Sequence, residues 1–175
     1  MKKIASIILA LFIMLGAAGC KQQQREQKNP AAYVPATAPL VTEELRNSAK
    51  MSPKNPRAWI ELGNALMDSE RFSEAIEAYQ KALALEPNNV DVRVDMGTCY
   101  RGTKQFDKAV LEYRKALKSD PNHPNGHRNL GVVLIYDLHK TDEGVKEFKK
   151  YLQLAPNAPD AGQLRQTVQE LSAWK

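Results

Sequence analysis

Two cysteines and three histidines are the residues of this chain best suited to nucleophilic or metal chemistry. His123 and His127 are four residues apart, which would suit a metal ion on one helix, but no cysteine or carboxylate stands beside them at ligand spacing. Cys99 lies next to Gly97 and Tyr100 in an apolar helical pattern that is typical of a buried structural thiol. The sequence has no phosphate-binding glycine loop, no Ser-His-Asp arrangement and no haem-attachment motif. We therefore predict no catalytic residue, no metal site and no cofactor, and we do not expect an enzyme.

The charge pattern argues against nucleic acid as a partner. The chain has 25 Lys and Arg against 20 Asp and Glu, a net charge of +5. The basic residues are spread along the sequence, and no basic run is interleaved with aromatic residues. Sparse glycine, 7% aromatic residues and abundant Leu and Ala fit a helical protein.

Residues 1–19 have the composition of a secretory signal. Lys2 and Lys3 precede an apolar stretch that ends in small residues and is shorter than the roughly 20 residues that span a membrane. Ala18-Gly19-Cys20 resembles the lipobox of bacterial lipoproteins, although Ala17 stands where that motif usually has leucine. The resemblance implies cleavage before Cys20 and attachment of lipid to its thiol. Ordinary cleavage, which would give a secreted protein without lipid, is the alternative, and a permanent transmembrane helix is less favoured.

Residues 20–40 are predicted to form a lipid-anchored, disordered tether. They are rich in Gln, Lys, Arg and Pro and offer little apolar surface to offset the entropy of ordering. Such a segment would hold the folded domain, residues 41–175, away from the membrane.

The folded domain repeats itself every 34 residues. Small, aromatic and proline residues recur in register: Gly63, Gly97 and Gly131; Ala75 and Ala109; Tyr79 and Tyr113; Ala82 and Ala116; Pro87 and Pro121. The period and pattern resemble the tetratricopeptide repeat, whose unit is two antiparallel helices. This resemblance implies an all-α solenoid with a half repeat at 41–55, full repeats at 56–89, 90–123 and 124–158, and a capping helix at 159–175.

The recurring residues have packing roles in such a repeat. The glycines are expected where the two helices cross too closely for a side chain. Ser73, Asp107 and Asp142 are expected to cap the second helices. An apolar stripe of Leu164, Val168 and Leu171 would close the last open face.

The third repeat departs from the pattern. Its second half runs one residue late, and we expect the extra residue in the turn at 137–141. Tyr151 stands where Ala82 and Ala116 stood, which predicts different packing against the element at 159–175.

The first helices of such repeats line a concave groove that the resemblance assigns to peptide binding. Twelve residues are predicted to line it: Arg57, Ile60, Asn64, Met67, Asp91, Val94, Thr98, Arg101, Asn125, Arg128, Val132 and Ile135. Three arginines among apolar residues suggest a peptide with apolar and some acidic side chains. A clamp for chaperone tails is not predicted, because Ile60 and Asp95 replace its Lys and Asn.

Together, the lipobox and the repeats imply a non-catalytic adaptor or scaffold of the bacterial cell envelope. It would be lipid-anchored, face the periplasm or the exterior, and bind an envelope protein or peptide in its groove; the outer membrane is expected if the host is Gram-negative. Two alternatives stay open. One is a module of cytochrome c maturation that holds apocytochrome segments, and the other is a self-assembling homo-oligomer.

Overall fold

The computed structural model describes residues 38–173, so the predictions for the signal peptide, Cys20 and most of the tether lie outside the described residues. The described part holds eight α-helices and one short π-helical segment: α1 (Ala38–Met51), α2 (Pro56–Asp68), α3 (Phe72–Leu85), α4 (Val90–Gly102), α5 (Phe106–Ser119), α6 (Pro124–Val132), η1 (Val133–Asp137), α7 (Thr141–Leu154) and α8 (Ala161–Ala173). None of these helices combines the length and the apolar character needed to cross a membrane.

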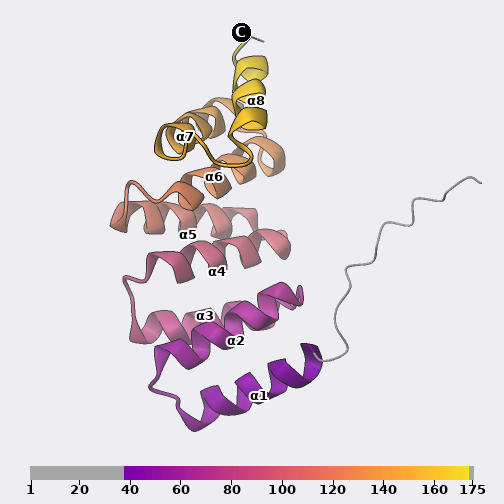
Figure 1. Ribbon diagram of the computed structural model, residues 1–175, viewed down its shortest axis with the longest axis vertical. Coiled ribbons are helices and arrows are strands. Elements are labelled where there is room, and N and C mark those ends of the chain that lie inside the picture. The colour runs from indigo at the N-terminus through magenta and orange to yellow at the C-terminus, as the bar shows by residue number, and fades with distance from the viewer. Residues whose placement is uncertain (1–37, 174–175) are drawn as a thin grey trace, which may run out of the picture. The chain divides into compact units, whose positions relative to one another are not determined.

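The helices stack in chain order as antiparallel pairs (Figure 1). The pairs are α2 with α3, α4 with α5, and α6 with α7, while α1 packs on α2 and α8 packs on α7. The predicted all-α solenoid is therefore confirmed. The first helix starts at Ala38, three residues before the predicted half repeat, and the capping helix starts at Ala161, two residues after Pro159.

Glycine is required where the two helices of each pair cross. A Cβ atom on Gly63 would lie 2.5 Å from Cε1 of Tyr79, and one on Gly97 would lie 2.6 Å from Cε1 of Tyr113. Both rings are buried, so neither can move aside. Gly131 meets Phe148 in the same way, which confirms the predicted role of the three glycines.

The fourth residue of each repeat makes one hydrogen bond that recurs through the domain. In each case, a side-chain nitrogen meets the backbone carbonyl oxygen of the proline six residues earlier. The three bonds are Trp59 Nε1 to Pro53 at 3.0 Å, Arg93 Nη2 to Pro87 at 2.6 Å and His127 Nε2 to Pro121 at 2.9 Å. Three dissimilar side chains therefore secure the same turn at the start of each first helix.

The second helices begin differently from the prediction. They start at Phe72, Phe106 and Thr141, so Ser73, Asp107 and Asp142 lie inside the first turn and are not the capping residues. The turn is instead set by the end of the first helix, where one residue per repeat adopts the left-handed conformation. These residues are Glu70, Lys104 and His139, with φ of 56°, 60° and 55°. Such a residue ends a helix and reverses the chain.

The extra residue of the third repeat lies inside its first helix rather than in the turn at 137–141. In the first two repeats, the amide of Ser69 or Thr103 donates to the carbonyl four residues earlier. In the third, Leu138 donates to Val133, five residues earlier, at 3.0 Å. The longer step is the π-helical segment η1, a common way for a helix to absorb one inserted residue.

The insertion turns Ile135 into the core. Ile135 is 7% exposed and fills the space beside Gly144, where the earlier repeats carry Ala75 and Ala109. A Cβ atom on Gly144 would collide with Ile135 Cγ1 and would lie 2.9 Å from the carbonyl oxygen of Gly131. The missing side chain at Gly144 therefore leaves the space that the Ile135 side chain fills.

Replacement of Gly144 by alanine is expected to destabilise the fold by about 1–3 kcal/mol, because overpacking outweighs the higher helix propensity of alanine. The double variant with Ile135→Ala should cost less than the sum of the two single changes, since the new methyl group occupies part of the vacated space. Chemical denaturation of the four proteins gives this coupling. Strict additivity would show that the two residues do not share the space.

Tyr151 ties the capping helix to the last repeat. Its hydroxyl donates to Asp160 Oδ1 at 2.6 Å, and Arg128 Nε donates to Asp160 Oδ2 at 2.5 Å. The Tyr151 hydrogen bond, followed by Arg128, holds the pKa of Asp160 below its usual range. Leu164 belongs to the same buried cluster as Tyr151, and Val168 and Leu171 pack against that cluster, so the stripe covers the last repeat as predicted.

Candidate protein-interaction surface

The candidate surface is the side of the domain formed by α2, α4 and α6, called here the first-helix face. The structure sorts the twelve predicted residues by exposure. Arg57, Asn64, Asp91 and Asn125 are exposed; Ile60, Met67, Thr98, Arg101, Arg128 and Val132 are partly buried; Val94 and Ile135 are buried. Ile135 is thus a core residue, because η1 rotates it away from the position that a 34-residue step predicts. Tyr136, the next residue, is 54% exposed instead.

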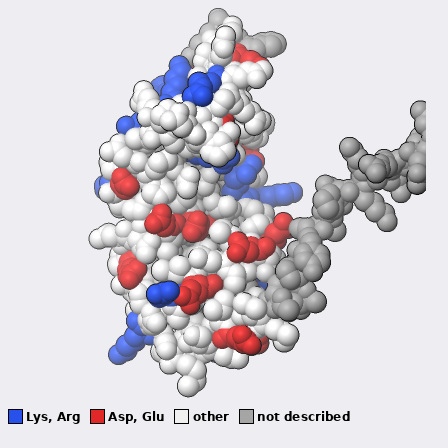
Figure 2. All heavy atoms as spheres, in the orientation of Figure 1, with Lys and Arg blue, Asp and Glu red and all other residues white. Residues whose placement is uncertain are grey.

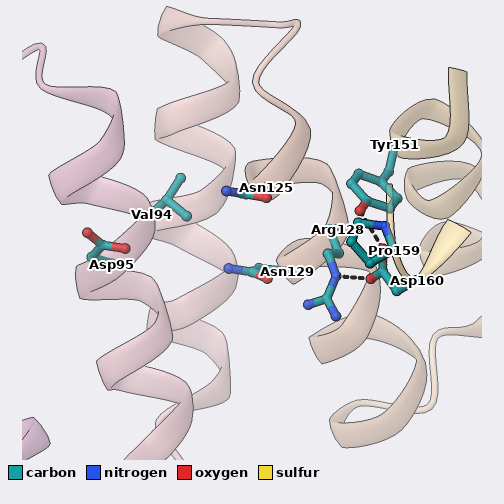
Figure 3. A pocket seen from close by; sticks show the side chains of 8 residues that line it. All are labelled: Val94, Asp95, Asn125, Arg128, Asn129, Tyr151, Pro159 and Asp160. Carbon is teal, nitrogen blue, oxygen red and sulfur yellow. Dashed lines mark hydrogen bonds and ion pairs between the residues drawn. The ribbon is translucent and has the colours of Figure 1, made fainter. Parts of the chain in front are cut away.

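One pocket on this face brings together residues of three successive structural units. It has a volume of about 490 Å³ and is lined by Val94 and Asp95 of α4, Asn125, Arg128 and Asn129 of α6, Tyr151 of α7, and Pro159 and Asp160 before α8. Figure 3 shows Asp95 on one side of this pocket and the Arg128–Asp160 pair on the other. Three of the predicted residues line it, namely Val94, Asn125 and Arg128.

The arginines of this face are already paired. From the sequence we expected them to be available to an acidic partner, but each donates to a carboxylate of this chain. The pairs are Arg57 with Glu61 at 2.9 Å, Arg101 with Asp137 at 2.5 Å, and Arg128 with Asp160 at 2.5 Å. The last two join residues 36 and 32 positions apart and so connect successive units. The arginines therefore offer an acidic peptide less unpaired charge than the sequence alone suggests.

Asp95 is the second acidic residue of the pocket besides Asp160, and from the sequence it was expected only as a departure from a chaperone-tail clamp. Burial raises the pKa of its carboxyl to about 6; Asp91 raises it further, His123 lowers it, and Asp68 adds the smallest increase. Within residues 38–173, no side chain or backbone group makes a hydrogen bond or ion pair with it. The only signal in the sequence that Asp95 could belong to the site was its position one residue after Val94, a predicted groove residue.

The comparisons with known proteins agree with this geometry. The sequence model described as "Tetratricopeptide repeat" matches residues 66–131. The helix pairs, the glycine crossings and this match together decide the architecture. The fold is a tetratricopeptide-repeat solenoid.

Solved tetratricopeptide-repeat-like structures support the same fold. A crystal structure of MamA shares 18% identity with this chain, with a TM-score of 0.70 over 78% of this chain and 79% of that one. Another crystal structure of MamA protein shares 26% identity, with a TM-score of 0.63 over 69% of this chain and 66% of that one. No curated protein matches the sequence. The fold of this repeat class supports a protein–protein interaction scaffold.

The residues considered for chemistry have structural contacts in the repeats. Cys99 is fully buried, and burial raises the pKa of its thiol to about 12. His123 Nδ1 accepts from the Gly126 amide at the start of α6, and its Nε2 lies 2.9 Å from Asp91. Across the described part of the chain, no group of three His, Cys, Asp or Glu side chains is placed to hold a metal ion.

Proposed function

We propose that this protein is a lipid-anchored adaptor of the bacterial envelope that holds a segment of another protein on its first-helix face. The observation that supports binding there is the pocket, which lies across α4, α6 and the start of the capping element. A site assembled from successive repeats presents side chains along a line, which suits an extended or helical segment. The part of the proposal that concerns the anchor comes from Cys20 and the small residues before it.

The anchor has a direct test. Mass spectrometry of the protein from its native membranes should show acyl chains on an N-terminal Cys20. Cys20→Ala should move the protein from the membrane fraction to the soluble fraction, because two or more acyl chains are needed for stable attachment. The matched control is Cys99→Ala, which alters the buried thiol and should leave the protein in membranes. An unmodified chain that begins at another residue would contradict the proposal.

The binding face is tested by photocrosslinking in the native cell. A photoreactive amino acid at Asn125, which is exposed and lines the pocket, should capture a partner that mass spectrometry can identify. The same group at Glu77, exposed on the second helix α3, serves as the control. Lys81 is unsuitable as a control because its ammonium lies 4.2 Å from the centroid of the Trp59 ring. Equal capture at both positions would rule out the first-helix face as the preferred binding surface.

A further inference from the structure

The charged side chains of the pocket differ in whether they have an ion-pair partner within the chain. Arg128 is held by Asp160, whose second oxygen accepts from Tyr151, so this cation and its carboxylate neutralise each other. Asp95, on α4, has no such partner among residues 38–173. The pocket therefore presents one unpaired carboxylate and one ion pair within the chain.

The surroundings of Asp95 add negative rather than positive potential. Asp91 on the same helix and Asp68 at the end of α2 both act on it unfavourably. His123 is the one nearby group that favours the ionised form, and its Nε2 already faces Asp91. Figure 2 shows acidic side chains gathered over the lower and middle part of the face on which α2 and α4 lie toward the viewer. A cationic ligand would meet an attractive field there.

The neighbouring wall offers neutral acceptors. Asn129 donates its amide nitrogen to Thr98 Oγ1 at 3.3 Å, which leaves its carbonyl oxygen free to accept from a ligand. Asn125, one helical turn earlier, is exposed beside the same pocket, as Figure 3 shows. In the view of Figure 3, both asparagine oxygens lie on the side of the pocket toward Arg128, so Asp95 is the acceptor on the opposite side.

We infer that the pocket receives a lysine or arginine side chain of the bound protein segment, with Asp95 as the carboxylate that pairs with it. This inference rests on the proposed function and specifies the partner's chemistry. A partly buried carboxylate without a counter-ion is unfavourable, and a cation supplied by the partner removes that cost. The binding segment is therefore basic at this point, whereas the arginines by themselves suggested an acidic one.

The experiment is a selection from a random twelve-residue peptide library displayed against the full chain. Selected peptides should be enriched in Lys and Arg and depleted in Asp and Glu. A synthetic consensus peptide should then bind about tenfold or more weakly to Asp95→Asn at pH 7.5, with circular dichroism confirming that the variant is folded. The matched control is Asp107→Asn, at an exposed aspartate on the second helix α5, which should bind as the parent does.

Two further measurements separate charge pairing from a general effect on the pocket. Replacing the basic residue of the peptide by norleucine should weaken binding to the parent but not to Asp95→Asn, because the pair is already lost in that variant. Binding to the parent should also weaken as the pH falls through about 6, where the Asp95 carboxyl takes up a proton. Three other charged groups act on this carboxyl, namely Asp91, Asp68 and His123. The pH dependence is therefore assigned to Asp95 only if the Asp95→Asn variant lacks it.

The outcomes distinguish the inference from the proposed function. Peptides that bind without basic enrichment, and equally to Asp95→Asn, would overturn the inference and leave the adaptor function standing. Failure to select any peptide would overturn both. Light scattering that shows self-association of the full chain, abolished by Asp95→Asn, together with no selected peptide, would assign the pocket to a second copy and likewise overturn the inference.

Discussion

Replacement of Gly97 by leucine is expected to lower the free energy of unfolding by about 2–4 kcal/mol. A Cβ atom at this position already lies 2.6 Å from Cε1 and 2.9 Å from Cδ1 of Tyr113. That ring is 1% exposed and belongs to the core shared by α5 and α6, so it cannot swing into solvent. The helices α4 and α5 must therefore separate. Thermal and denaturant unfolding measure the change.

Gly162 provides the matched control for this substitution. It also lies in a helix, α8, but a Cβ atom there would meet no atom within 4 Å. Gly162→Leu should be neutral or stabilising by up to about 1 kcal/mol, because leucine has the higher helix propensity. Equal destabilisation by the two substitutions would mean that the loss at Gly97 comes from helix propensity or solubility rather than from the crossing.

The second large effect is expected at Arg93. Arg93→Ala should destabilise the protein by about 2–4 kcal/mol, because it leaves the carboxylate of Glu112 buried without its main partner. Arg93 Nη1 donates to Glu112 at 2.7 Å, and the Glu112 side chain is 8% exposed. The substitution also removes the bond to the Pro87 carbonyl. Lys115, 2.7 Å from the other carboxylate oxygen, keeps the loss from being larger.

The first repeat suggests how to repair this loss. At the positions of Arg93 and Glu112, it has Trp59 and Ala78, both buried, with Lys81 over the indole. The double substitution Arg93→Trp and Glu112→Ala should therefore recover most of the stability lost in Arg93→Ala, since it removes the buried carboxylate and restores a donor for the proline carbonyl. Lys115, in the register of Lys81, is free to lie over the new ring. A double variant as unstable as Arg93→Ala would show that the two repeats do not use equivalent packing.

The close packing of the repeats could be predicted because it is local and periodic. Gly63, Gly97 and Gly131 recur at one step, and a residue with no side chain at a helix crossing has a single evident role. Tyr151 could be predicted to pack differently because it replaces alanine at a known position. In both cases, the residue type itself carries the information.

The charge state of the candidate surface could not be predicted in the same way. The partner of Arg101 is Asp137, which is 36 residues away and follows the inserted residue of η1. A strict repeat period of 34 residues gives no reason to pair Arg101 with Asp137. The same period predicted that Ile135 lies on the surface, whereas it is buried. One inserted residue changes which side chains point outward, so the Arg101–Asp137 pair emerges only from the three-dimensional arrangement.

The tyrosine at position 151 has a consequence for how many units this chain can contain. Ala82 and Ala116, its counterparts, are buried and small, so another helix pair can dock closely against each of the first two units. Tyr151 instead fills that space and reaches Asp160 of the capping element. A duplicated unit placed between the first and second repeats would find compatible neighbours on both sides, whereas one placed after the third would meet the ring. The Tyr151 side chain therefore opposes the addition of a further helix pair after the third repeat.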